Sequence, residues 1–266
     1  MPEGPEVKIA SDFINNFFDN KLDIKFEIIS DYYNEKYYNV FNTISNNLNP
    51  GFTPTFTIGK NLFIKLKNKK IFNFHLGMTG GWSKENKKHC HFRIYNDKQE
   101  LFFVDIRKFG KMKILNKDEI LLKFNPKIDL LNKEYCRNYH LEILEKINTT
   151  RSICSIIMDQ KFFPGVGNYI KSEALYLAKI HPEEKWKNIN IKSKKILINS
   201  LQKIMKESYY SGGAELKDFK NPFKSSKFKL KVYGKKNTDK KTNVISIVTS
   251  DQRKSWYCEK TQKLKN

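Results

Sequence analysis

Residues 159–180 read DQKFFPGVGNYIKSEALYLAKI, and their pattern indicates the local fold more strongly than any other stretch. We predict a helix that ends at Gln160, a Pro-Gly turn and a second helix that begins around Asn168. Gly165 and Gly167 allow the backbone to approach a bound group closely, and a helix N-terminus presents free N–H groups to an anion. The segment therefore predicts a phosphate-binding unit that holds a nucleic-acid backbone without reading its sequence.

Charge is the strongest signal in the composition. The 266 residues include 50 Lys and Arg against 28 Asp and Glu, a net charge of +22. An AT-rich coding sequence would account for part of the lysine content but not for the shortage of acidic residues. Because the basic residues run along the whole chain, we expect a nucleic-acid partner and not a membrane. No apolar stretch is long enough to span a bilayer, and we expect a soluble protein.

The four cysteines, Cys90, Cys136, Cys154 and Cys258, share no CxxC spacing. The pattern favours free thiols over a disulfide framework or a sequence-local zinc site. The first residues, MPEGPEV, have neither the charge nor the hydrophobicity of a signal or transit peptide. We therefore expect an intracellular protein, in the cytoplasm or the nucleus.

The predicted fold class is α+β with two domains. Apolar spacing predicts an N-terminal helix, and short β-rich runs from about residue 22 to 115 predict antiparallel strands of a sandwich or barrel. After a connector with a Pro turn, helical periodicity returns, and we place the domain boundary between residues 131 and 132. The last part predicts strands again, in KFKLKVYGKK, VISIVTS and SWYCEK.

Three separated stretches, MPEGPEVKIASDFIN, DQKFFPGVGNYIKSEALYLAKIHPE and DQRKSWYCEKTQ, together resemble the Fpg/Nei family of DNA glycosylases. Shorter pieces in matching order are GKNLFIKL, HLGMTG, KHCH, DIRKFG and SGGAELKDF. The resemblance implies a catalytic β-sandwich domain with flanking helices over residues 1–131. It also implies a helix–two-turns–helix domain over 132–266 that ends in a β-hairpin from about residue 228.

The resemblance implies a bifunctional DNA glycosylase and AP lyase of base excision repair, acting on double-stranded DNA with oxidised bases or abasic sites. Gly4 looks like the endonuclease VIII branch, which implies oxidised pyrimidines and hydantoins as substrates. A formamidopyrimidine or 8-oxoguanine glycosylase stays the alternative, as does a non-catalytic helix–two-turns–helix protein that binds nucleic acid. We expect a monomer that needs no cofactor.

The catalytic roles follow from the same resemblance. Once Met1 is removed, the terminal amine of Pro2 is the expected nucleophile, because an α-amino group titrates near pH 8 and is partly neutral at physiological pH. Glu3 is the expected general acid–base. Glu6 is either a second proton-handling group or a solvated carboxylate at a helix start. Lys60 resembles the family lysine that reaches the phosphate beside the lesion.

Other residues match DNA contacts of the family. Those expected at phosphates are His89, Arg107 and Asn168. Arg151 is a further candidate because it lies just before the helix of the DNA-binding motif. The side chains expected to fill the gap left by an extruded base are Met78, Arg107 and Phe109, although Met78 and Phe109 could instead be core. His91 is expected to pack or to be solvated, since neighbouring strand residues face opposite ways and cannot share a metal. Glu173 is expected to brace the motif.

The C-terminal hairpin departs from the many relatives that hold it with four cysteines around zinc. Only Cys258 is present in this hairpin, and Thr261 stands where a second cysteine of a CxxC pair would be. We therefore predict a zincless finger, held by packing of Val244, Ile245, Ile247, Trp256 and Tyr257. The resemblance places Arg253 at its tip, where it would grip the phosphates that flank the lesion. The loop SGGAELKDF is expected to cover the extruded base.

Overall fold

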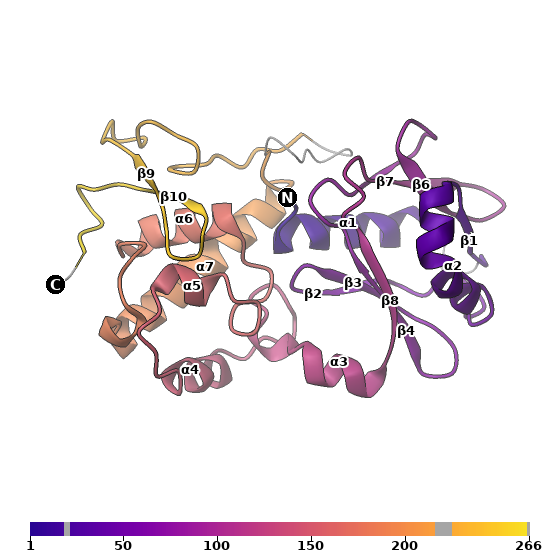
Figure 1. Cartoon of the computed structure of the whole chain (residues 1–266), viewed down its shortest axis with the longest axis horizontal. Helices are drawn as coiled ribbons and strands as arrows, with labels where there is room; N and C mark the ends of the chain where they lie inside the picture. Colours follow the sequence, from indigo (N-terminus) through magenta and orange to yellow (C-terminus); the bar gives the residue numbers. More distant parts are fainter. Residues whose placement is uncertain (19–21, 216–224, 265–266) are drawn as a thin grey trace. The chain divides into compact units, whose positions relative to one another are not determined.

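A computed structural model describes residues 1–18, 22–215 and 225–264. The chain divides into two compact units (Figure 1). The first holds Met1–Pro2 and most of residues 6–124, and the second holds Glu3–Pro5, Asn125–Ala214 and Lys227–Asn266. In the described part of the chain, no helix is both long and apolar enough to cross a membrane.

The first unit is a β-sandwich of two four-stranded antiparallel sheets, in the orders β1-β6-β7-β5 and β2-β3-β4-β8. This confirms the predicted architecture. The strands are β1 (Lys25–Ile28), β2 (Phe56–Ile58), β3 (Asn61–Lys65), β4 (Lys70–His75), β5 (Gly81–Ser83), β6 (Cys90–Tyr95), β7 (Glu100–Val104) and β8 (Lys111–Asn116). The same part of the chain contains three helices: α1 (Gly4–Phe17), α2 (Asp31–Ser45) and α3 (Lys117–Lys123).

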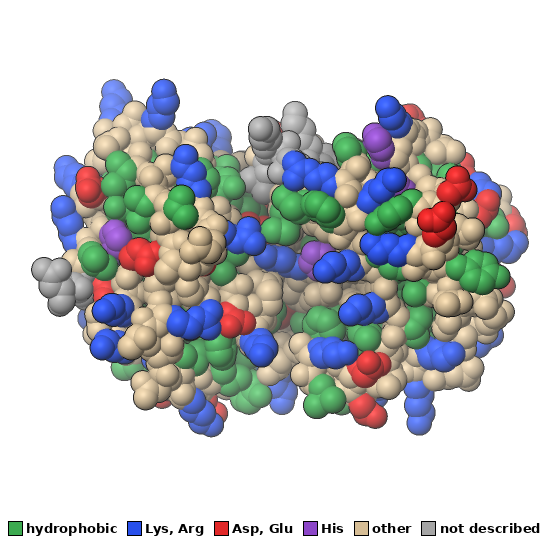
Figure 2. All heavy atoms as spheres, viewed as in Figure 1, with side chains coloured by type: hydrophobic (Ala, Val, Ile, Leu, Met, Phe, Trp, Pro, Cys, Tyr) green, Lys and Arg blue, Asp and Glu red, His purple; other side chains and the backbone are tan. Residues whose placement is uncertain are grey.

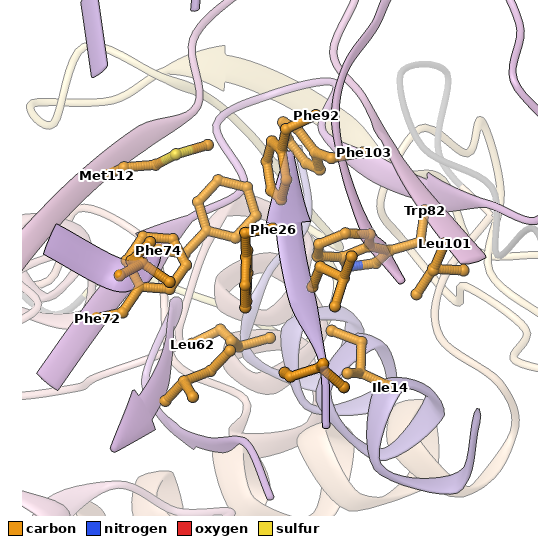
Figure 3. Close-up of a cluster of buried hydrophobic side chains, with 14 of the residues drawn as sticks. Ile14, Phe26, Leu62, Phe72, Phe74, Trp82, Phe92, Leu101, Phe103 and Met112 are labelled. Atoms are coloured by element: carbon orange, nitrogen blue, oxygen red, sulfur yellow. The ribbon is translucent and has the colours of Figure 1, made fainter. Parts of the chain in front are cut away.

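The core of this unit is rich in aromatic side chains (Figure 3). Phe74 from one sheet meets Phe103 from the other edge-on, with ring centroids 4.6 Å apart. Such pairs add specific geometry to the burial of large apolar surfaces, and this favours one arrangement of the sheets. The opposite face of the β2-β3-β4-β8 sheet is apolar at one end, where Phe63, Ile71 and Leu115 form a smaller cluster.

Helix α2 differs from the sequence prediction, which placed strands throughout this region. Ser30 caps its N-terminus by accepting a hydrogen bond from the Tyr33 backbone N–H. Tyr33, Tyr37 and Phe41 lie on its buried face at a spacing of four residues. The helix forms because this apolar stripe has helical spacing and packs on the core of the sandwich.

The second unit is mainly helical. Its elements are η1 (Pro126–Ile128), α4 (Arg137–Glu145), α5 (Ile153–Ile157), α6 (Asn168–Ala178), η2 (Trp186–Asn188), α7 (Ile191–Tyr210), β9 (Ile245–Val248) and β10 (Lys254–Tyr257). The second helix of the quoted motif begins at Asn168 as predicted, whereas the first ends at Ile157, before Gln160.

The prediction of a strand over KFKLKVYGKK was wrong. The carboxylate of Glu173 accepts hydrogen bonds from the backbone N–H groups of Lys231, Val232 and Tyr233, at 2.8–3.1 Å. These donors are therefore bound to a carboxylate and are not available to a neighbouring strand. The same bonds agree with the bracing role expected of Glu173. The hairpin itself, β9 and β10, forms as predicted.

Candidate active site and nucleic-acid interface

Glu3 lies at the N-terminus of α6. Its carboxylate accepts hydrogen bonds from the backbone N–H groups of Tyr169 at 3.0 Å and Ile170 at 3.3 Å. The N-cap residue of this helix, Gly167, offers no side chain, so Glu3 supplies the cap from elsewhere in the chain. A Cβ atom at position 167 would overlap the Glu3 carboxylate. Gly167 is thus required for the approach of the predicted acid–base residue.

Gly4 has a packing role next to Glu3. Its N–H donates to the carbonyl oxygen of Gly165 at 2.8 Å, and a Cβ atom at position 4 would lie 3.1 Å from the Gly165 Cα. A larger residue would push this N-terminal segment away from the turn before α6. The small residue at position 4 therefore has a structural explanation that is independent of substrate choice.

The other predicted catalytic residues of the N-terminal region belong to the first unit. Pro2 is buried, and Glu6 is fully buried in the first turn of α1, so the interpretation of Glu6 as a solvated carboxylate was wrong. Lys60 lies in the two-residue turn between β2 and β3, after Gly59 with a φ of +60°. Its side chain is only 8% exposed.

The predicted gap-filling residues lie together. An Arg107 guanidinium nitrogen approaches the Met78 sulfur at 3.9 Å. Phe109 is 51% exposed and Met78 is partly exposed, so the core interpretation of Phe109 was wrong. The exposed residues 106–109 form a loop whose apolar and basic side chains could enter a base stack.

The buried Asp105 holds these loops in place, a role that the sequence analysis missed. One carboxylate oxygen accepts from the Thr79 hydroxyl at 2.6 Å, and the other accepts from the Gly110 N–H at 2.7 Å. The Thr79 hydroxyl in turn accepts from the Arg107 N–H at 3.1 Å. Asp105 and Thr79 therefore connect the Met78 loop with the Arg107–Phe109 loop.

A pocket of about 600 Å³ opens on the outer face of the β2-β3-β4-β8 sheet. Five lysines line it, and none of its lining residues is acidic: Met1, Lys36, Asn61, Asn73, His75, Gly77, Met78, Lys108, Phe109, Gly110, Lys111, Lys113, Leu115, Lys123 and Phe124. Figure 2 shows Lys and Arg side chains over the visible face of both units. The chemistry of this pocket suits a phosphate group.

His75, also missed by the sequence analysis, is an uncharged donor in this pocket. Its pKa is lowered to about 4, mainly by burial and in addition by the positive charges of Lys60 and Lys111. The Gly77 N–H donates to His75 Nδ1 at 3.0 Å, so the neutral ring carries its proton on Nε2. This N–H can donate to an anion at neutral pH.

His89 and His91 behave differently. His89 is partly exposed with a φ of +69°, in the turn before β6. His91 packs as predicted, stacked on Tyr33 with ring centroids 4.4 Å apart and hydrogen-bonded to Ser30 and the Asp105 carbonyl. In residues 1–18, 22–215 and 225–264, no group of three His, Cys, Asp or Glu side chains could hold a metal ion.

A second pocket, of about 740 Å³, belongs to the helical unit. It is lined by Thr150, Arg151, Ser152, Ser155, Met158, Asp159, Glu183, Lys185, Ser250, Asp251, Gln252 and Arg253. Arg151 is held by Asp159 at 3.4 Å and by the Ser155 carbonyl at 3.0 Å. Arg253 is exposed in the turn between β9 and β10. The structure thus brings these two predicted phosphate contacts to one pocket.

Asn168 joins the hairpin to α6. Its side-chain amide donates to the Lys254 carbonyl at 2.9 Å, next to Arg253.

In the loop SGGAELKDF, Gly212 and Gly213 have φ angles of +92° and +88°, while residues 216–219 lie outside the described part of the chain.

The hairpin does not offer the donor set of a zinc finger. The Cys258 thiol is hydrogen-bonded to the Thr242 hydroxyl at 3.3 Å, which lies 2.5 Å from the Thr238 hydroxyl. Val244 and Tyr257 are buried as expected, whereas Ile245, Ile247 and Trp256 are only partly buried. Neutral threonine hydroxyls are not zinc ligands of the kind found in structural sites, and one thiol does not complete a tetrahedral site.

Comparison with known proteins gives a consistent result. Residues 1–112 match the formamidopyrimidine-DNA glycosylase N-terminal domain, and residues 128–220 match its H2TH domain. A formamidopyrimidine-DNA glycosylase of Zymomonas mobilis is 33% identical over 202 residues, 71% of this chain and 74% of the relative. One of Rickettsia bellii is 31% identical over 222 residues, 77% of this chain and 79% of the relative.

Solved structures share the fold. MutM in complex with DNA containing carbocyclic 8-oxo-G is similar with a TM-score of 0.81 and 23% identity, over 98% of this chain and 99% of that chain. Lactococcus lactis Fpg in complex with DNA containing an abasic site has the same values. At 23% identity, the similarity to these solved structures supports the fold alone.

Proposed function

Because this chain belongs to the formamidopyrimidine-DNA glycosylase family of DNA glycosylase/AP lyases, we propose that it removes formamidopyrimidine and 8-oxoguanine type lesions from double-stranded DNA. The name of its 33% identical relative supports this substrate class over oxidised pyrimidines and hydantoins. The endonuclease VIII-like prediction depended on Gly4, whose close contact with Gly165 explains the small residue without reference to substrate. The match of both halves of the chain to one family carries this proposal.

Pro2 is the proposed nucleophile. After removal of Met1, its neutral secondary amine attacks C1′ of the damaged nucleotide while the bond from C1′ to the base breaks. The sugar ring then opens and leaves an iminium between Pro2 and C1′. This electron sink acidifies the C2′–H bond, and loss of that proton expels the 3′ phosphate. A second elimination, through C4′, expels the 5′ phosphate.

Glu3 is the proposed proton carrier. The peptide chain places it directly after Pro2, and two backbone N–H groups of α6 orient its carboxylate. A carboxyl group so placed can protonate the departing base or the ring oxygen and later accept a proton. Glu6, fully buried one turn further along α1, is proposed to support this region.

The two pockets are proposed as phosphate sites. In the first unit, Lys60 and the neutral His75 would contact the backbone near the lesion, and Lys111 and Lys113 would extend this track. His89 would contact a phosphate from the turn before β6. In the second unit, Arg253, Arg151 and Asn168 would contact the backbone from the hairpin and the helix motif. Such contacts fix the position of DNA of any sequence.

Base extrusion is proposed to use the wedge residues Met78, Arg107 and Phe109. Their exposure, and their attachment through Thr79 and Asp105, support a preformed wedge that replaces the extruded nucleotide. Preformation reduces the ordering cost of binding.

A panel of duplexes, each with one lesion, tests the substrate class. Formamidopyrimidine, 8-oxoguanine, thymine glycol and a hydantoin would be compared by single-turnover excision rates. We expect the first two to be processed fastest. Faster excision of thymine glycol would support the endonuclease VIII-like alternative, and binding without excision of any base would support a non-catalytic protein.

A further inference from the structure

We infer that Lys171 and Asp251 form a buried lock that holds the hairpin turn on helix α6 and positions Arg253; this rests on the proposed phosphate contact of Arg253. The Lys171 ammonium lies 2.6 Å from an Asp251 carboxylate oxygen. The two side chains are 0% and 5% exposed. Burying two charges is costly unless they pair closely, so this contact restricts the hairpin to positions in which the pair stays intact.

Asp251 transmits this restraint to Arg253. Its second carboxylate oxygen lies 3.3 Å from the Arg253 N–H and 2.6 Å from the Thr249 hydroxyl. The Thr249 N–H in turn donates to the Arg253 carbonyl at 3.0 Å. Both backbone groups of Arg253 are therefore held by residues of the same turn, and that turn is tied to α6 by Lys171.

The same face of α6 makes two further polar contacts with the hairpin. Asn168 donates to the Lys254 carbonyl at 2.9 Å, and the Ser172 hydroxyl accepts from the Trp256 N–H at 3.4 Å. Residues 168, 171 and 172 have the i, i+3, i+4 spacing of one helix face. Lys171–Asp251 is the charged contact among these three. In a hairpin that contains only Cys258, this docking supplies an orientation that a metal ion would otherwise fix.

Affinity for an uncleavable duplex with a tetrahydrofuran abasic analogue tests the lock. Arg253→Ala should weaken binding about tenfold, because a charged hydrogen bond to phosphate is lost, and Asp251→Asn and Lys171→Met should each weaken it by the same factor. In each variant the slope of log K against log salt should fall by about 0.9, the value for one phosphate. In a protein that already carries Arg253→Ala, Asp251→Asn should cause no further loss of affinity. Lys171→Arg keeps the positive charge, so this variant should bind DNA like the wild-type protein.

Lys203→Met is the matched control. Lys203 forms an exposed pair with Glu207 on α7 at 3.8 Å, and its removal should leave affinity and salt slope unchanged. If a single variant of the lock does not fold, Lys171→Met/Asp251→Leu removes both buried charges and keeps the site apolar. We expect this double variant to fold and to bind DNA like Arg253→Ala.

The outcomes separate the lock from the proposed function. The lock would be overturned if Arg253→Ala weakens binding while Asp251→Asn keeps wild-type affinity and salt slope. The same result for the folded double variant would also overturn it. A loss in Asp251→Asn that adds fully to that of Arg253→Ala would also overturn it, since the two residues would then act independently. Wild-type binding by Arg253→Ala would instead refute the phosphate contact of Arg253.

Discussion

At the scale of single residues, Glu3 connects the N-terminal segment with the helix motif. Its carboxylate caps α6 across a separation of 166 residues in sequence. A group held by two N–H donors has few accessible rotamers, so its position relative to Pro2 is restricted in advance of DNA binding. The requirement for glycine at position 167 follows from the same contact.

Glu3→Gln should separate the two chemical steps. Excision of an intact damaged base should fall by about 10²–10⁴-fold, the usual contribution of a general acid. Cleavage at a preformed abasic site should largely remain, because no base has to leave. Single-turnover rates on both substrates measure this, with Glu142→Gln, an exposed residue of α4, as control. Equal loss of both activities would mean that Glu3 only stabilises the fold.

The resemblance of short sequence motifs to the Fpg/Nei family predicted the candidate residues Pro2, Glu3, Lys60, Met78, Arg107 and Phe109. Their surroundings could not be predicted in the same way. The cap made by Glu3 joins distant segments, and the neutral state of His75 depends on burial and on the charges of Lys60 and Lys111. Local patterns contain neither kind of information.

At the scale of elements, strand β8 carries exposed lysines into the pocket of the first unit. Lys111 pairs with His75 across the sheet, and Lys113 pairs with Asn73. Lys111→Gln/Lys113→Gln should lower the salt slope of duplex binding by up to about 1.8, at about 0.9 for each phosphate contact. Fluorescence anisotropy at several salt concentrations measures it. Lys192→Gln/Lys195→Gln on α7 is the control, and identical slopes for both pairs would contradict a phosphate track on β8.

The hairpin should need no zinc. Treatment with a strong chelator should leave the melting temperature and strand cleavage unchanged, since the hairpin contains one thiol and its threonines are poor zinc ligands. Elemental analysis of active protein should find far less than one zinc per chain. Stoichiometric zinc that is lost together with activity would contradict the zincless finger.

Helix α4 contains a pH-sensitive residue. Burial lowers the pKa of the fully buried His140 to about 4, although its hydrogen bond to the Phe162 carbonyl acts in the opposite direction. As the pH falls, this histidine is protonated in the unfolded chain at a higher pH than in the folded chain. The folded state therefore loses stability as the pH falls from about 6.5 towards 4. His75 adds a change of the same sign.

Urea unfolding at pH 7 and pH 4.5 should show this loss, on the order of 2 kcal/mol for one such histidine. His140→Gln keeps an amide donor near Phe162 and removes the titration, so its stability should change less between the two pH values. An equal change in both proteins would show that other groups cause it.

Periodicity predicted most elements, and the exceptions have physical causes. Helix α2 had a readable signal in its Ser30 cap and in the spacing of Tyr33, Tyr37 and Phe41, which the strand propensity of tyrosine and phenylalanine obscured. The segment around Val232 alternates like a strand but gives its N–H groups to Glu173. Such a tertiary acceptor is not visible in local sequence.

At the scale of the whole molecule, charge and family membership agree. The chain carries a net charge of +22, and Lys and Arg side chains lie on the visible face of both units (Figure 2). The pocket of the first unit is lined by lysines without acidic residues, and the pocket of the second unit contains Arg151 and Arg253. Of the proposed site residues, Pro2, Lys60 and the wedge residues belong to one unit, and Glu3, Asn168 and Arg253 belong to the other.

Borohydride trapping with peptide mapping tests the central claim most directly. Protein with a free Pro2 would be incubated with a lesion-containing duplex and borohydride, and the adduct would be located by mass spectrometry. The proposed chemistry predicts a stoichiometric adduct on the Pro2 nitrogen, and it predicts that a tag before Pro2 abolishes trapping while DNA binding remains. An adduct on an internal lysine such as Lys60, or trapping that persists with the tag, would contradict it.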